Sequence, residues 1–583
     1  MADGTAAGTY LLVDVGHVLT HVAYVAPVEG VARLVALAEA STTNALADGG
    51  LLEGVRRAIA NLHVLIGRQI LEPSGELKRP SDDDGHGVDG VVLTTSLAPT
   101  LRVAVVGLTR DLSLASAVRA ATLPYVTIVR TICLESSTRR WETEDLQALA
   151  GDPPDAVVMV GGIDGGPVAP IRDMGEMLSA AYSVLPEGAR PVMIFAGNAR
   201  AHRPLIAAFS GVTDLRLVAN VRPTAQSESL EELRATLTRL FYARQVSQAE
   251  ELQAVSRWAQ SVILSDLDAM ARSLRFLARR YSLGKGLLGV DVGGNGSRVL
   301  LVRPQGEALT WTSPFGCGAA VAALRDLGDP TAVMRWMHHR LSWAEVWDRL
   351  SNVEVRPAGV PQTEEDWDLQ QASARESLRR TWSGALAAWG QGRAEAICQE
   401  ADVVVARGSV LNRARTPGCA ALMLIDALQL TGLVRLTLDW ANILPGLAGL
   451  ARTDGLSAVQ VLDYDGLMDL GTLVAPAGWG RAGTPALRAR MLVQGELRAE
   501  VSVPAGSIRR LPLGVNEMAQ LELYPARGFD LGAGRPGRPG VAEVRGGALG
   551  VIIDARGRPL QLPADEAERA RALETWEREI DGA

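Results

Sequence analysis

Residues 11–25 read LLVDVGHVLTHVAYV, and residues 288–302 read LGVDVGGNGSRVLLV. Aligned without a gap, both have an apolar run, an Asp-Val-Gly segment and a second apolar run, with Asp14 opposite Asp291. Each pattern predicts a β-hairpin with a carboxylate at the mouth of its turn. A carboxylate there can hold a hydrated metal ion, and loop N–H groups can bind phosphate oxygens.

An ordinary buried hairpin that ends in Asp-x-Gly is the alternative explanation of either stretch, because such turns are common. Two copies, each opening a separate lobe, favour two duplicated halves that close on one nucleotide. That arrangement resembles the actin/Hsp70/sugar-kinase superfamily. We therefore expect an α/β fold with duplicated actin-like (ribonuclease H-like) ATPase lobes and a C-terminal β-rich domain.

The bulk composition narrows the class of protein. With 583 residues the chain is too long for a single core, and we expect about three domains. A net charge of −8 gives no basic surface for nucleic acid or an anionic membrane. The four cysteines are far apart and form no Cys-x-x-Cys pair, which favours a reducing compartment over a disulfide framework or zinc site. Without a basic leader or an apolar run of about 18 residues, a cytoplasmic protein is expected.

The succession of predicted elements divides the chain into four regions. Residues 1–226 alternate strands with helices, which predicts a first lobe on a mainly parallel sheet with covered faces. Residues 227–282 are helical and charged and are expected to connect the lobes, and residues 283–452 form the second lobe. In residues 453–583, short strands alternate with Gly/Pro turns and precede a charged helix. This composition predicts a separable β-rich domain used for partner contact.

Ligands of parallel sheets bind at the carboxyl ends of the strands. Asp164, Gly197 and Asn198 follow two predicted strands of the first lobe. Asp164 lies in a Gly-Ile-Asp-Gly-Gly turn and is interpreted equally as a turn former or as a contact for a ligand or partner.

The order of short motifs along residues 10–452 resembles the MutL/GlmL-type accessory proteins of adenosylcobalamin-dependent glutamate (methylaspartate) mutase. The most specific part is Gly161–Gly166 together with Asn220–Pro223, because generic sugar kinases do not share it. The motifs that carry the resemblance are Asp14-Val-Gly16, Arg102–Leu108, Gly161-Gly-Ile-Asp-Gly-Gly166, Phe195-Ala-Gly-Asn198, Asn220-Val-Arg-Pro223, Asp291-Val-Gly-Gly294 and Ile443-Leu-Pro-Gly-Leu-Ala-Gly449.

The resemblance implies an actin-like ATPase that reactivates a cobalamin-dependent mutase by helping a damaged cobalamin to leave. Such a chaperone would bind ATP or ADP with Mg²⁺, with Asp14 and Asp291 holding the ion through water, and a homo-oligomer is a candidate state. The positions that the resemblance assigns to the nucleotide are Asp14, Gly16 and Thr20 in the first phosphate loop, Asp291, Gly293 and Gly294 in the second, and Gly408 in the adenosine loop.

Three departures from the family pattern concern these loops. His17-Val-Leu19 precedes Thr20 where small hydroxyl residues are usual, and apolar side chains cannot donate to a phosphate. In the second loop Ser297 can still donate, but Arg298 replaces an acid that could bind Mg²⁺ or orient water. Arg298 could instead pair with a phosphate. Arg407-Gly-Ser409 replaces a Gly-Gly pair and brings a side chain toward the adenine position. We therefore expect weak nucleotide binding with slow hydrolysis or none.

Two histidine pairs are weaker candidates. His17 and His21 lie four apart on a strand or turn, where this spacing gives no shared metal-binding face. His338 and His339 are adjacent, so in a helix they point about 100° apart and make a poor ligand pair. Both pairs are interpreted as structural.

Three functions are compatible with these features. The first is an ATP-binding accessory protein that remodels a cobalamin-dependent mutase subunit. The second is a nucleotide-silent actin-like scaffold whose C-terminal β domain recruits a partner. The third is a kinase for a small metabolite, which needs a catalytic Asp base for which the sequence shows no motif.

Overall fold

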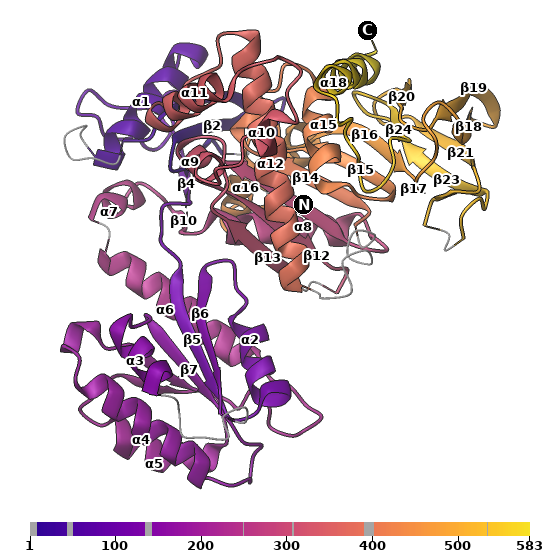
Figure 1. Ribbon diagram of the computed structural model, residues 1–583. Coiled ribbons are helices and arrows are strands. Elements are labelled where there is room, and N and C mark those ends of the chain that lie inside the picture. The colour runs from indigo at the N-terminus through magenta and orange to yellow at the C-terminus, as the bar shows by residue number, and fades with distance from the viewer. Residues whose placement is uncertain are drawn as a thin grey trace. The chain divides into compact units, whose positions relative to one another are not determined.

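Figure 1 shows the computed structural model of the chain, which describes residues 8–43, 50–134, 143–248, 250–305, 308–389, 401–532 and 535–582. The chain divides into two compact units. The main unit comprises Met1–Leu97 and Ala254–Ala583, and the inserted unit comprises Ala98–Gln253. Of the four cysteines, Cys398 lies outside the described residues.

The first predicted hairpin is confirmed and lies within a five-stranded sheet of the main unit. In spatial order the strands are β10 (Ser261–Ile263), β4 (Gly90–Thr95), β1 (Tyr10–Val15), β2 (Leu19–Val28) and β3 (Val31–Ser41). β1, β2 and β3 are antiparallel neighbours, whereas β1, β4 and β10 are parallel neighbours. The end of β1, which carries Asp14, therefore lies between the start of β2 and the end of β4.

The second predicted hairpin is also confirmed and belongs to an eight-stranded sheet of the main unit. In spatial order the strands are β13 (Ala308–Ser313), β12 (Gly296–Val302), β11 (Leu287–Gly293), β14 (Val403–Arg407), β15 (Gly432–Leu438), β16 (Met468–Ala475), β24 (Val551–Asp554) and β20 (Ile508–Leu511). β13, β12 and β11 are antiparallel neighbours, and β11, β14 and β15 are parallel neighbours. The two sheets therefore share the order and directions of five strands.

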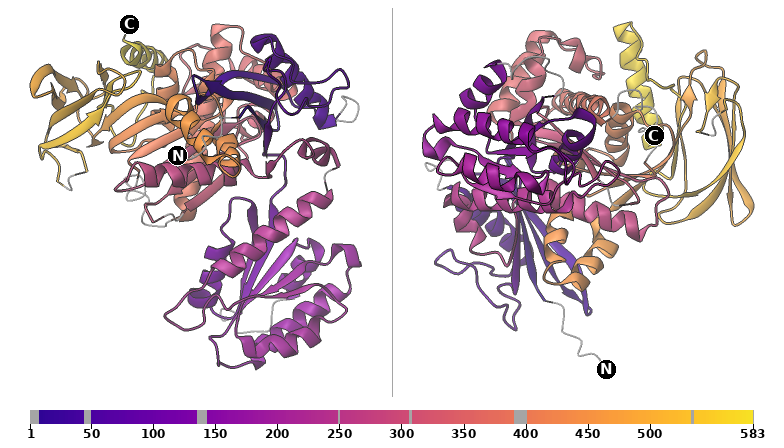
Figure 2. Two further views of the ribbon diagram at one scale, coloured as in Figure 1. Left: turned by 180° about the vertical axis from the view of Figure 1, so that it is seen from behind. Right: turned by 90° about the horizontal axis from the view of Figure 1, so that it is seen from below.

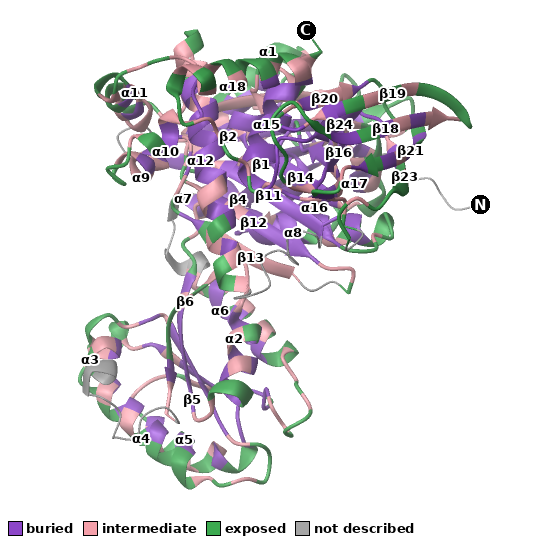
Figure 3. Ribbon diagram, turned by 45° about the vertical axis from the view of Figure 1, so that its right-hand side comes forward, coloured by how far each residue is buried: buried purple, intermediate pink, exposed green. Residues whose placement is uncertain are grey.

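Helices of the main unit bury their apolar faces against these sheets, whose strands form the buried centre (Figure 3). α1 (Gly50–Ile66) packs on β2 and β3. α15 (Pro417–Leu428) is mostly apolar and is buried from Gly418 to Leu428, as expected of a helix enclosed on all sides. The other helices are α8 (Asp266–Arg280), α9 (Ala322–Arg325), α10 (Thr331–Met334), α11 (Trp343–Val355), α12 (Glu364–Trp389), α14 (Ser409–Asn412), α16 (Leu444–Leu450), α17 (Gly455–Val461) and α18 (Glu566–Asp581). Within the described ranges, no helix has the length and apolar character needed to cross a membrane.

The region after residue 453 shares its sheet and its core with the rest of the main unit. β16 pairs antiparallel with β15, and β24 and β20 extend the same sheet. Trp576 and Ile580 of α18 belong to the same buried cluster as Leu288 and Val290 of β11. A separate four-stranded sheet contains β19 (Glu496–Pro504), β18 (Pro485–Val493), β21 (Met518–Pro525) and β23 (Gly540–Arg545), and β17 (Ala477–Gly478) pairs with β22 (Phe529–Asp530). Strand periodicity did not reveal that β16, β24 and β20 join this sheet, and the separability of the region stays a prediction.

The inserted unit contains a five-stranded sheet in which all neighbouring strands are parallel. A parallel sheet was predicted for residues 1–226 as one lobe, but this range is divided between the two units at Leu97. In spatial order the strands are β6 (Val126–Cys133), β5 (Leu101–Gly107), β7 (Ala156–Val160), β8 (Val192–Phe195) and β9 (Leu215–Leu217). Helices cover the sheet, as Figure 2 shows. They are α2 (Ala115–Ala121), α3 (Thr143–Gly151), α4 (Ala169–Ser183), α5 (His202–Phe209) and α6 (Glu231–Gln248).

Residues 227–282, predicted as one helical connection, are divided between the two units. α6 belongs to the inserted unit, and α7 (Glu250–Ser256) spans the division. β10 and α8 belong to the main unit, where β10 forms the edge of the five-stranded sheet.

Candidate functional site

A cleft in the main unit is formed by the β1–β2 turn, the β11–β12 turn and the loop between β14 and α14. Its empty space, open mouth included, is about 890 Å³. The predicted site residues that line it are Asp14, Gly16, Asp291, Gly293, Gly294, Arg298 and Gly408. Both aspartates therefore face one cleft, as expected from the two hairpins. Their roles toward a ligand remain predictions.

Asp291 lies between two arginines at one level of the large sheet. Arg298 is its register partner on β12, and Arg407 is its register partner on β14. Arg298 Nη1 lies 3.3 Å from Asp291 Oδ2 and 2.5 Å from Oδ2 of Asp266, the first residue of α8. The register of the three strands therefore places a positive charge on each side of this carboxylate.

Asp14 is held from both sheets. Thr94 Oγ1 of β4 donates to Asp14 Oδ1 at 2.7 Å, and Arg407 Nη2 of β14 donates to Asp14 Oδ2 at 2.9 Å. The sequence suggested that Arg407 would extend toward the adenine position. Its guanidinium is instead engaged by Asp14, because the two residues approach each other across the cleft.

Burial and ion pairing set the ionisation of these groups. Burial raises the pKa of Asp291, although Arg407 and Arg298 oppose the shift. Burial acts on Asp266 in the same direction, but Arg298 and Arg407 outweigh it and lower its pKa. Burial also disfavours the charge of Arg407, yet Asp291 and Asp14 raise its pKa above the ordinary value. Arg407 is thus cationic, and Asp291 binds a proton more readily than an exposed Asp.

Sequence reasoning missed two acids of this region. Asp266 lines the cleft, and Asp439, which follows β15, is fully buried. Asp439 accepts hydrogen bonds from the N–H groups of Ile443 and Leu444 at 2.9 and 3.1 Å. Burial raises the pKa of Asp439 to about 6. A Ser265-Asp266 helix start and an acid directly after a buried strand were the signals available in the sequence.

Glycines allow the cleft loops to approach one another closely. A Cβ atom on Gly294 would lie 2.5 Å from Val18 Cγ2, and one on Gly408 would lie 2.3 Å from the carbonyl oxygen of Val292. Gly408 also has a φ of 124°, which strongly favours glycine. Such loops can bring backbone N–H groups close to a bound anion.

A magnesium ion does not fit the arrangement predicted at Asp14 and Asp291. Mg²⁺ requires about six oxygen ligands in an octahedron. The two oxygens of Asp14 accept hydrogen bonds from Thr94 and Arg407, and Asp291 faces Arg298. The water-mediated metal role of Asp14 and Asp291 stays a prediction, and this arrangement does not favour it because guanidinium groups lie beside both carboxylates.

Three predicted residues are not among those that line the cleft. Thr20 is buried, and its Oγ1 lies 2.9 Å from Thr42 Oγ1. Ser297 is buried, and its hydroxyl has no hydrogen-bond partner among the described residues. Asp164 belongs to the inserted unit, where it accepts a hydrogen bond from Asn220 Nδ2 at 3.0 Å and lines a hollow beside the ends of β8 and β9.

The first histidine pair has separate polar partners. His17 Nδ1 lies 3.2 Å from Ser96 Oγ, and His21 Nδ1 lies 3.3 Å from Glu39 Oε2. These contacts agree with the structural interpretation.

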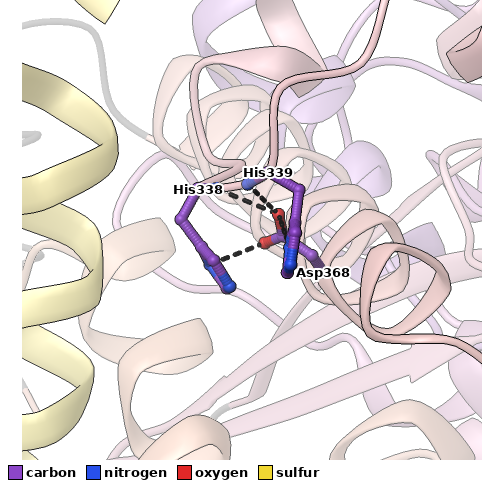
Figure 4. A group of neighbouring side chains, drawn as sticks. All are labelled: His338, His339 and Asp368. Atoms are coloured by element: carbon purple, nitrogen blue, oxygen red, sulfur yellow. Dashed lines mark hydrogen bonds and ion pairs between the residues drawn. The ribbon is translucent and has the colours of Figure 1, made fainter. Parts of the chain in front are cut away.

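His338 and His339 lie in a bend after α10 rather than in a helix, so their expected divergence is wrong. Both imidazoles face Asp368 of α12 (Figure 4), with Nδ1–Oδ distances of 3.1 Å for His338 and 3.2 Å for His339. The backbone N–H groups of both histidines also donate to Asp368 Oδ2, at 3.0 and 2.8 Å. The three residues are close enough to hold a metal ion. Three hydrogen bonds and an ion pair nevertheless satisfy the buried carboxylate, which favours a structural role.

The main unit defines the chain as an α/β protein in which two Asp-Val-Gly hairpins meet at a glycine-lined cleft with the buried Arg407 and the half-buried Arg298. A family model described as MutL protein matches residues 10–465, and the chain therefore belongs to this family. No curated protein matches the chain.

Several solved structures are similar over most of their length. Nucleotide-free acetone carboxylase is 12% identical, with 85% of this chain and 81% of that chain covered and a TM-score of 0.34. The activator of 2-hydroxyisocaproyl-CoA dehydratase from Clostridium difficile with bound ADPNP is 10% identical, with coverages of 78% and 97% and a TM-score of 0.29. A glycerol dehydratase reactivase is 11% identical, with coverages of 71% and 94% and a TM-score of 0.27. TM-scores this low do not establish a shared fold.

Proposed function

We propose that this chain is an ATP-binding accessory protein that reactivates a cobalamin-dependent mutase of the glutamate mutase type in the cytoplasm. Membership of the MutL protein family supports the accessory role, and the matched region contains all the motifs that resemble such proteins. The partner is then the cobalamin-binding subunit of the mutase. The proposed fold is a pair of duplicated actin-like lobes, supported by the shared order and directions of five strands in two sheets.

The observation that carries the nucleotide-binding proposal is the convergence of both hairpin turns on one cleft. Gly293, Gly294 and Gly408 line it, so backbone N–H groups can reach phosphate oxygens. Arg298 and Arg407 also line it, and guanidinium groups form strong hydrogen bonds with phosphate. A nucleoside phosphate is the ligand class that uses both features.

We propose that the nucleotide is bound but turned over slowly or not at all. Phosphoryl transfer to water needs charge stabilisation, usually by a metal ion, and a residue that positions the attacking water. Arg298 is at the position where an acid was expected, and it contacts Asp266 and Asp291. Asp14 is committed to Arg407 and Thr94. Neither aspartate is therefore free to orient a metal-bound water.

A nucleotide-silent scaffold is the second candidate, and the Arg407–Asp14 pair favours it. This pair joins the two sheets without any ligand, so the cleft does not depend on a nucleotide to neutralise its acids. In this alternative the chain binds the same mutase subunit, and ATP does not change the release of cobalamin.

A cobalamin-release experiment distinguishes the two functions. The full chain is mixed with a mutase subunit that carries an inactive cobalamin, and free cobalamin is followed by its absorbance after separation. ATP-dependent release supports the accessory function. Binding of the subunit with equal release in the presence and absence of ATP supports the scaffold. No binding of a cobalamin-dependent mutase subunit contradicts both.

A further inference from the structure

The charged side chains that line the cleft are balanced. The carboxylates are Asp14, Asp266 and Asp291, and the guanidinium groups are Arg298, Arg407 and Arg413. A cleft that recruits Mg²⁺ needs carboxylates with spare negative charge. Arg413 pairs with Glu39, so Arg298 and Arg407 supply the counter-charge, and the register of β12, β11 and β14 fixes both beside Asp291.

Arg407 is bound only in part by its neighbours. Its relative exposure is 5%, and Nη2 donates to Asp14. Its Nε and Nη1 atoms have no hydrogen-bond partner among the described residues. Buried donors without partners are uncommon and costly, and a guanidinium fork matches the oxygens of a phosphate. Because Arg407 lines the cleft, a phosphate group bound there can satisfy these donors.

We propose that the cleft binds a nucleoside di- or triphosphate without a divalent cation, and that Arg407 and Arg298 take the place of that cation. The inference rests on the proposed nucleotide-binding function and specifies how this chain achieves it. Asp14 and Asp266 then act as anchors that position the two guanidinium groups. Arg407 contacts phosphate through Nε and Nη1 while Asp14 retains Nη2.

The test is calorimetric titration of ADP into the full chain, once with Mg²⁺ and once with EDTA. We expect the wild type to bind ADP at least as tightly in EDTA as in Mg²⁺, because the site takes metal-free ADP and Mg²⁺ sequesters ADP in solution. Arg407→Ala removes the internal cation and exposes Asp14, so its affinity for ADP in EDTA should fall by about tenfold or more. Mg²⁺ should restore part of that loss. Paramagnetic resonance of Mn²⁺ should then show metal bound with ADP to Arg407→Ala but not to the wild type.

Arg375→Ala is the matched control for removal of a buried arginine. Arg375 pairs with Asp426 at 3.0 Å and does not line the cleft, and Asp426 retains a second partner, Arg556. This variant should bind ADP as the wild type does in each buffer. If Arg407→Ala does not fold, Arg407→Lys replaces it, because lysine keeps the charge but loses the fork. Its affinity should be lower than that of the wild type in both buffers, without a gain in Mg²⁺ dependence.

The possible results distinguish failure of this inference from failure of the proposed nucleotide-binding function. Wild-type binding that weakens tenfold or more in EDTA overturns the inference and leaves nucleotide binding intact. Absence of ADP binding in both buffers overturns the proposed nucleotide function and the inference together. Equal affinities of the wild type and the Arg407 variant, in both buffers, show that Arg407 does not contact phosphate.

Discussion

Arg407 and Asp14 are 393 residues apart in the chain, yet Nη2 of Arg407 lies 2.9 Å from Oδ2 of Asp14. The pair joins the last residue of β14 to β1 and thus links the two sheets of the main unit. Their side chains are 6% and 14% exposed, so water screens the pair weakly. This contact determines both the electrostatics of the cleft and part of its stability.

Breaking this pair should destabilise the main unit. Asp14→Ala leaves the Arg407 charge buried without its hydrogen-bonded partner, which should lower the free energy of unfolding by about 3 kcal/mol. Chemical denaturation of the full chain measures the loss. Glu53→Ala removes the more exposed Arg57–Glu53 pair and should change stability very little. Equal losses of unfolding free energy in the two variants would show that the Arg407–Asp14 pair contributes no more than an exposed ion pair.

Removal of the C-terminal region should unfold the main unit. Truncation after Arg452 deletes β16, β24, β20 and α18, which exposes the edge of β15 and the apolar core under α18. We expect an insoluble chain, or a melting temperature many degrees lower. Thermal melting followed by circular dichroism measures this. A soluble truncated chain that melts near the full-length value would restore the idea of a separable domain.

The contact between His338 and Asp368 should make stability depend on pH. Burial lowers the pKa of His338, but its hydrogen bond to Asp368 and the charges of Asp368 and Glu577 outweigh burial and raise it above 6.5. Stability from the protonated ring is therefore complete below about pH 6.5 and is lost as the pH rises through the higher folded-state pKa. The melting temperature of the wild type minus that of His338→Gln should fall over about pH 6 to 8. This fall should be lost or reversed in an Asp368→Asn background, where burial dominates, and an unchanged fall there would assign it to another group.

ATP turnover should be slow, because the cleft offers no fitted Mg²⁺ site. We expect a steady-state rate far below about one per second, the lower end of typical enzyme turnover. Phosphate release from the full chain measures it. Wild-type turnover near one per second would contradict slow hydrolysis.

The sequence predicted the individual strands and helices more fully than the way in which they pair with one another. The hairpins at Asp14 and Asp291 follow from apolar runs around glycine turns. The positions of β16, β24 and β20 in the large sheet could not be read, because a strand pattern does not identify its neighbour. The bend that turns both His338 and His339 toward Asp368 depends on tertiary contacts.

The sequence predicted several of the residues that line the cleft, but it did not predict how their charged side chains pair. Asp14, Asp291 and the glycines were recognised from the repeated motif. Arg407 was recognised as a departure, but its contact with Asp14 depends on how β1 and β14 approach each other. Sequence spacing carries no information on such a contact. Because of this pairing, the structure shows a cleft with carboxylates beside arginines where the sequence predicted a Mg²⁺ site.

Nucleotide affinity of the cleft is the decisive quantity, and titration of ATP into the full chain and a Gly294→Val variant measures it. We predict a wild-type dissociation constant on the order of 100 μM, because the missing loop hydroxyls each remove about 1 kcal/mol or more of binding. Gly294→Val fills the loop where a Cβ already meets Val18, so its binding should be lost. Gly455→Val, where a Cβ meets nothing within 4 Å, should bind as the wild type does. No wild-type binding at millimolar ATP, or equal binding by Gly294→Val, would contradict a nucleotide site in this cleft.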